Sequence, residues 1–318
     1  MKSALCELLN IEYPIISGAM TLVSNSDLVS AVSNAGGCGI FATGDAAQKG
    51  GIERIRNEIK RIKSLTDKPF GVNVAMISPI AKEIMDTVCE EHVSMITTGA
   101  GSPAPYMEQL KNAGVKVVPV VPSKKAALKM EALGADAVVA EGMESGGFIG
   151  KETTMVLVPE VTAAVNIPVI AAGGFADGRG LAAAFALGAC GIQMGTRFMV
   201  CKESPIQSIF KEAIIQQGAA DAIIEGAMMK KAIPHRSIRT AAAEAVIQYE
   251  KDPEATTEEY FKRFYAGRMA INSDLDQAIL GMGQTAALIH EELTAKEIID
   301  SIMLEFNRVV KDMQRFAE

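Results

Sequence analysis

Short apolar runs alternate with segments of helical period through the first two thirds of the chain, and this alternation restricts the fold more than any other feature. Between the runs, apolar residues recur on one helical face, as at Ile52, Ile55, Ile59 and Ile62. Parallel strands must be joined by a crossover, usually a helix, so the alternation predicts an α/β fold with a parallel sheet. The predicted strands are Pro14–Ile16, Gly39–Ala42, Phe70–Val74, Met95–Thr97, Val115–Val121, Ala137–Ala140, Pro168–Ala171 and Gly191–Met194.

Eight such units predict a closed (β/α)₈ barrel, which needs about 200 residues at the low end of its range. The run Val115–Val121 is apolar with little alternation, as expected for a strand that is buried on both faces. A doubly wound open sheet is the alternative, and it usually carries a G-x-G-x-x-G turn after its first strand. Here Ser17-Gly18-Ala19-Met20 follows the first strand, which favours the barrel.

The alternation of apolar runs and helical segments ends after Phe198. Residues 202–286 show no clear strand and are predicted to be helical, and one amphipathic helix begins near Thr294. We therefore predict three parts: a barrel over residues 1–201, a helical cap over 202–292 that covers the barrel mouth, and a C-terminal helix over 293–318 that packs on the barrel.

Composition and charge narrow the class of protein. The net charge of −7 disfavours nucleic-acid binding, which needs a basic face. The five cysteines form no C-x-x-C pair, which disfavours zinc and iron–sulfur sites, and they fit a reducing compartment. An acid, Glu7, stands where a signal peptide would be apolar, and no apolar stretch approaches 18 residues. We expect a cytoplasmic protein with no membrane partner.

Paired small residues follow the last two predicted strands. Gly173-Gly174 comes directly after the seventh strand, and Gly195-Thr196 ends the eighth. Glycine lets backbone N–H groups approach an anion closely, and the loops after strands seven and eight are the usual phosphate site of such barrels. The alternative is that the glycines only shape tight turns.

A second glycine cluster, Glu141–Gly150, follows the sixth strand and holds four glycines in ten residues. It indicates backbone that passes close to a flat ligand, or else a flexible loop. Asn73 is a polar residue at an otherwise apolar strand end, where it could bond a cofactor ring or simply cap the chain.

Together these residues resemble the nitronate monooxygenase/FabK-type enoyl-acyl-carrier-protein reductase family of FMN-dependent barrels, and above all its enoyl reductase branch. The resemblance implies FMN, with its phosphate on Gly173, Gly174, Gly195 and Thr196. It also implies further cofactor contacts at Gly18, Ala19, Met20, Asn73, Glu141, Gly146, Gly147, Gln193 and Met194. The motifs that carry it are Ile15–Met20, Pro69–Val74, Thr97–Gly101, Ala140–Gly150, Pro168–Gly178, Gln193–Phe198 and Gly283–Ala286.

The sequence departs from this family at the position of its acid/base histidine, where Phe148 stands. Phenylalanine transfers no proton, and losing such a group typically costs about 10²–10⁴-fold in rate. Met20 is followed by Thr21 and not by the aromatic residue common in the enoyl reductases. We assign Phe148 and Thr21 to the substrate pocket, and two changes in one pocket indicate a different substrate.

Three histidines could replace the missing one. His92 ends a predicted helix on the far side of the barrel, and His290 is interpreted as structural. His235 lies in the cap and is the candidate for reaching the pocket. Around it, Lys230–Arg239 carries four cations and no acid. This segment could bind the phosphates of NAD(P)H or coenzyme A, or an acidic carrier protein, or it could be a solvated face.

Three functions remain open. The first is reduction of an enoyl thioester by NADH or NADPH through FMN, with an unidentified proton donor. The second is a nitronate-monooxygenase-like oxidase, and the third is a flavin-binding or carrier-binding protein without turnover. We also expect a homodimer.

Overall fold

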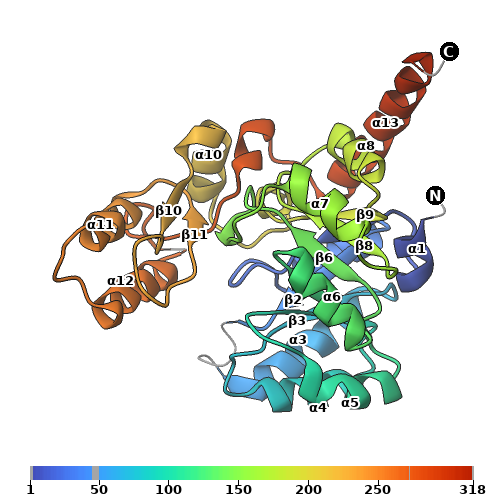
Figure 1. Ribbon diagram of the computed structural model, residues 1–318, viewed down its shortest axis with the longest axis horizontal. Coiled ribbons are helices and arrows are strands. Elements are labelled where there is room, and N and C mark those ends of the chain that lie inside the picture. The colour runs from blue at the N-terminus through green and yellow to red at the C-terminus, as the bar shows by residue number, and fades with distance from the viewer. Residues whose placement is uncertain (1–2, 45–49, 272, 317–318) are drawn as a thin grey trace.

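Eight parallel strands close a barrel within residues 3–44, 50–271 and 273–316, the part of the chain that the computed structural model describes (Figure 1). All eight predicted strands are present. The first strand pairs with both the second and the last, so the open-sheet alternative is wrong. In barrel order the strands are β1 (Ile15–Ser17), β2 (Cys38–Ala42), β3 (Gly71–Ala75), β4 (Met95–Gly99), β5 (Lys116–Val121), β6 (Val138–Glu141), β8 (Val169–Ala172) and β9 (Gly191–Met194).

Helices surround this barrel and continue into the cap. The 3₁₀ turns are η1 (Ala104–Tyr106), η2 (Ala219–Asp221), η3 (Gln284–Leu288) and η4 (Gln314–Phe316). The α-helices are α1 (Ala4–Leu9), α2 (Ser26–Asn34), α3 (Gly51–Leu65), α4 (Ala81–Glu90), α5 (Met107–Asn112), α6 (Lys124–Ala132), α7 (Thr154–Thr162), α8 (Gly178–Ala186), α9 (Thr196–Met199), α10 (Ser208–Gln216), α11 (Ala241–Glu250), α12 (Thr257–Met269) and α13 (Ala295–Met313).

The inside of the barrel is filled by apolar side chains from alternate strand positions, and α1 contributes Leu5 to the same cluster. Ile16, Met95 and Val139 are among its fully buried members. Because successive strand residues point to opposite faces, the residues two positions further along these strands also point inward. Thr97, two positions after Met95, and Glu141, two positions after Val139, are therefore polar residues that point inward near the carboxyl ends of their strands.

Helix α13 packs between α8 and α2 in the outer layer of helices. Thr294 caps its N-terminus through a reciprocal pair of hydrogen bonds with Glu297. Its buried stripe includes Ile298, Ile302 and Phe306. The last turns of α13 project away from the barrel (Figure 1).

The cap lies together on one side of the barrel, drawn in yellow-orange and orange in Figure 1. Its own small core includes Val246, Tyr260 and Phe264. The purely helical prediction for this region is wrong, because β10 (Ile223–Glu225) and β11 (His235–Ser237) form an antiparallel pair. A further strand from the barrel loop, β7 (Gly147–Phe148), joins them. Strands of two or three residues are too short to show a period of two.

No helix in the described residues has the length and apolar character needed to cross a membrane.

Candidate functional site

The carboxyl ends of the barrel strands bring several predicted residues to one level. Ala172 belongs to the inner cluster of the barrel. Its register partners are Glu141 on one side and Gln193 on the other, so their side chains also point inward. On the opposite wall Asn73 pairs in register with Thr97. The Asn73 Nδ2 donates to the Thr97 Oγ1 over 2.9 Å, which fixes the amide inside the mouth.

Glu141 is the acid of this inner layer. Burial raises the pKa of its carboxyl from the ordinary 4.5 to about 7. In the described part of the chain no ion pair joins it to a cation. Glu141 therefore keeps a proton at neutral pH to a far greater extent than an exposed glutamate does.

The turn after β1 forms one rim of the mouth. The Gly18 amide donates to the Met194 carbonyl at the end of β9. Ser24 holds the turn, since its hydroxyl accepts from the Met20 amide at 2.9 Å. Ala19 and Thr21 are half-buried on this rim. A side chain at Gly18 would press on Gln193 at 3.1 Å, so only glycine leaves that amide in place.

The two glycine loops after β8 and β9 form an open backbone cradle. Gly173 and Gly174 both have φ near +86°, with values of +85° and +87°, and Gly173 packs against the Gly142 carbonyl. The amides of Gly174 and Gly195 donate to no acceptor in the described residues. Around Gly195 only the Met20 sulfur lies within 4 Å of an added Cβ, at 3.7 Å. Free N–H groups in open space are what a phosphate needs.

The glycine loop after β6 is ordered by its own contacts. Glu144 accepts hydrogen bonds from the amide and the hydroxyl of Thr154 and thereby caps α7. A Cβ on Gly146 would lie 2.6 Å from the Gly283 amide, so this glycine is required by close approach of the chain to itself. Gly147 has a positive φ of +79°, and nothing lies within 4 Å of an added Cβ. The flexible-loop alternative is therefore disfavoured.

The segment around Gly283 closes over this loop. The Gly283 amide donates to the Thr196 Oγ1 at 3.0 Å, and the Gln284 amide donates to the Glu144 carbonyl at 2.9 Å. Thr196 is thus tied to the C-terminal segment and still has its hydroxyl hydrogen to donate.

Phe148 and His235 are brought together by the small sheet. They are direct partners in the β7–β11 pair, with ring centroids 5.4 Å apart. Phe148 is 47% exposed, whereas His235 is fully buried. Glu225 and Arg268 are the hydrogen-bond partners of His235. No sequence pattern links them to it, because they lie on separate elements, 10 and 33 residues away in the chain.

The other histidines and the basic segment lie in different surroundings. His92 and His290 are both exposed, and His92 lies after α4, at the end of the barrel away from the mouth. The four cations of the predicted basic segment do not form one patch. Lys230 and Lys231 are exposed, Arg239 pairs with Glu244, and Arg236 is buried. The Arg236 Nη2 donates to the Met143 carbonyl at 3.1 Å and supports the glycine loop from below.

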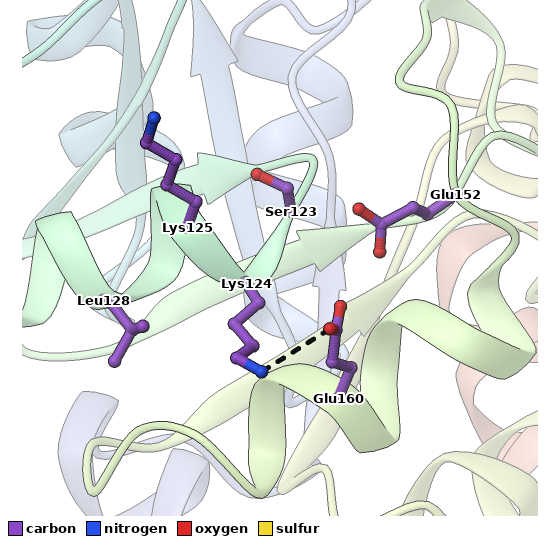
Figure 2. Close-up of a pocket in the computed structure, with 6 residues that line it drawn as sticks. All are labelled: Ser123, Lys124, Lys125, Leu128, Glu152 and Glu160. Carbon is purple, nitrogen blue, oxygen red and sulfur yellow. Dashed lines mark ion pairs between the residues drawn. The ribbon is translucent and has the colours of Figure 1, made fainter.

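A separate hollow of about 420 Å³ lies outside the barrel between α6 and α7. Figure 2 shows Lys124 pointing toward Glu160, with 3.7 Å between the charged atoms. Burial, together with the charge of Glu160, raises the pKa of Glu152 there. The hollow is lined mostly by side chains of α6 and α7 that carry both signs of charge, and none of the residues singled out in the sequence lines it. Its lining residues are Ser123, Lys124, Lys125, Leu128, Glu152 and Glu160.

Comparison with known proteins places this site in context. The profile of the nitronate monooxygenase family matches residues 2–92 and 78–305. FabK from Thermotoga maritima has a solved structure that is 42% identical, with a TM-score of 0.94 over 99% of each chain. A nitroalkane oxidase from Streptomyces ansochromogenes is 26% identical, with a TM-score of 0.83 over 98% of this chain and 100% of its own.

A curated relative from Rhodococcus jostii is 38% identical over 76% of this chain. It is a (3aS,4S,5R,7aS)-5-hydroxy-7a-methyl-1-oxo-octahydro-1H-indene-4-carboxyl-CoA dehydrogenase, and the match spans 66% of its length.

Proposed function

The chain belongs to the nitronate monooxygenase family of flavin-dependent oxidoreductases, and from that premise we propose that it reduces an enoyl thioester with NADH or NADPH through bound FMN. The observation that carries the proposal is the similarity to FabK along 99% of both chains. The relative from Rhodococcus jostii, whose name specifies a carboxyl-CoA compound, also supports a thioester.

The barrel mouth fits a flavin mononucleotide. The unpartnered amides of Gly174 and Gly195, with the Thr196 hydroxyl, would hold the phosphate. Gly18, Ala19 and Met20 would border the ring on one side. Met194, Gly146 and Gly147 supply further backbone at the same rim, and the inward Asn73, Glu141 and Gln193 would offer polar contacts. When bound, FMN supplies hydride transfer from NAD(P)H to the β-carbon of the enoyl group.

The protein must also provide a proton for the α-carbon. Phe148 cannot give one, and His235 is buried. Burial raises the pKa of Glu141 to about 7, so a large share of its carboxyl groups carry a proton at neutral pH, and it is our candidate donor. Phe148, half exposed on the loop above β6, would serve as an apolar wall for the acyl group. Thr21, on the rim after β1, would border the pocket from another loop.

The test is anaerobic reduction of the purified yellow protein, followed by addition of a short enoyl thioester while the flavin absorption band is recorded. Rapid return of the oxidised band supports enoyl reduction. A flavin that stays reduced until air enters contradicts it, and a protein that binds no flavin contradicts the cofactor assignment.

Nitronate oxidation is the second candidate, because the similarity to the nitroalkane oxidase also covers nearly both whole chains. A preformed nitronate needs no deprotonation, so Phe148 does not argue against it. In the same apparatus, flavin reduction by an alkyl nitronate without NAD(P)H would favour this activity. A yellow protein that exchanges electrons with none of these compounds would favour binding without turnover.

A further inference from the structure

Three aromatic rings meet where the glycine loop joins the cap. Phe148 comes from β7, His235 from β11 and Phe264 from α12. The His235 ring lies edge-on to both phenylalanines, with centroids 5.4 Å from Phe148 and 4.9 Å from Phe264. Because directly opposed residues of an antiparallel pair point to the same face, the register itself places the imidazole beside Phe148.

Both ring nitrogens of His235 lie within hydrogen-bonding distance of a partner. Its Nε2 lies 3.0 Å from an Arg268 Nη1, and its Nδ1 lies 3.3 Å from a Glu225 carboxylate oxygen. A guanidinium only donates hydrogen bonds, so Nε2 must accept. The ring hydrogen then sits on Nδ1 and is donated to Glu225.

The surroundings keep this imidazole neutral. Burial and the nearby Arg268 charge hold the pKa of His235 well below its ordinary range. Burial raises the pKa of Glu225 to about 7, although Ser237 also donates a hydrogen bond to it. Nε2 carries no hydrogen and faces a cation, so His235 is not placed to act as an acid.

We propose that His235 is a positioning residue that fixes the ring of Phe148 at the barrel mouth. Its imidazole bridges Glu225 of β10 and Arg268 of α12, and thus fixes the β10–β11 strand pair to α12. Phe148 packs on the exposed side of that bridge. For its effect on substrate this inference rests on the proposed function, whereas the position of the ring is measurable without substrate.

The direct test places 4-fluorophenylalanine at position 148 and records its fluorine NMR signal in the flavin-loaded protein. His235→Asn keeps an N–H donor toward Glu225 but does not reach Arg268. His235→Gln reaches Arg268 with an acceptor but does not keep the donor toward Glu225. We expect one narrow signal in the parent and a shifted or broadened one in both variants. Arg239→Gln is the control, since its exposed side chain pairs with Glu244 outside the cluster, and it should leave the signal unchanged. Folded His235 variants with the parent signal would overturn the proposal.

The kinetic test separates positioning from acid catalysis. The edge-to-face contact between His235 and Phe148 is worth a factor of about 2 to 12 in an equilibrium, which sets the upper limit on how far its loss can displace the ring. KM for the enoyl thioester should therefore rise by no more than that factor, while kcat and its pH profile hold. A loss of kcat with an altered pH profile would make His235 catalytic and reject the positioning role. If no thioester is reduced by the parent, the proposed function fails while the fluorine result still decides this inference.

If the His235 variants do not fold, NMR of the unmodified protein still tests the proposed bridge. Nitrogen NMR of its imidazoles should show one histidine with hydrogen on Nδ1 that does not titrate through the neutral range. A His235 that titrates with its ordinary pKa would refute the locked bridge.

Discussion

A charged side chain at Gly195 would test most directly whether the two glycine loops after β8 and β9 bind a phosphate. The Gly195 amide has no acceptor in the described chain, and an added side chain meets open space apart from the Met20 sulfur. Gly195→Asp should therefore fold normally and lose flavin, because the carboxylate repels the phosphate. Gly195→Ala is the matched control and should keep most of the affinity. Flavin release measured by fluorescence checks both, and equal retention by the two variants would contradict the phosphate assignment.

Glu141 gives a prediction in which the direction of the pH effect is fixed. Its folded pKa of about 7 lies above the ordinary 4.5, so the stability that it contributes is present at low pH and is lost as pH rises through 7. Glu141→Gln keeps the shape of the neutral acid and should remove this loss. Thermal unfolding of the flavin-free protein at about pH 5 and about pH 8 measures it.

The same variant tests the proton donor. If Glu141 protonates the acyl chain, Glu141→Gln should bind flavin but turn over about 10²–10⁴-fold more slowly. The parent rate should fall above pH 7 as the carboxyl ionises, and the variant should lack that fall. A variant with the parent rate and pH profile would exclude Glu141 as the donor.

At the scale of elements, the contact between α8 and α13 is the point where the last helix closes the outer layer. A Cβ on Gly178, the first residue of α8, would lie 2.5 Å from the Ile302 carbonyl oxygen of α13. Both groups belong to rigid helices, so Gly178→Ala should cost about 1–3 kcal/mol of unfolding free energy. The closest atom to a Cβ on Gly180, in the same helix, is a ring carbon of Phe175 at 3.1 Å, and the other neighbours are at ordinary contact distance, so Gly180→Ala should cost less. Urea unfolding compares them, and equal losses would contradict this account.

At the scale of the whole molecule, the apolar stripe of α13 continues past the body of the protein. After Phe306 the stripe runs on through Val310, Met313 and Phe316, which are exposed. We expect these residues to form the contact of a homodimer, because a second copy would cover the same stripe. Met313→Asp with Phe316→Asp should yield monomers, while Lys311→Glu should not. Light scattering measures the masses, and a monomeric parent would rule the contact out.

The sequence by itself determined the barrel and the position of the glycine loops after its last two strands. Each depends on local patterns: apolar runs such as Val115–Val121, the helical spacing between them, and paired glycines directly after a strand. The contacts of Asn73, Glu141 and Gln193 with a cofactor were expected only from the family resemblance, and the strand register brings the three residues to the carboxyl ends of the barrel strands.

Only the tertiary structure decided the cap and the surroundings of Phe148. Three-residue strands such as β10 and β11 carry no readable period, and the pairing of Phe148 with His235 joins two segments that no local signal connects. The bridge from Glu225 through His235 to Arg268 likewise exists only after the β10–β11 strand pair packs on α12. Burial then sets the protonation of these groups and of Glu141, since desolvation depends on the whole fold and not on neighbours in sequence.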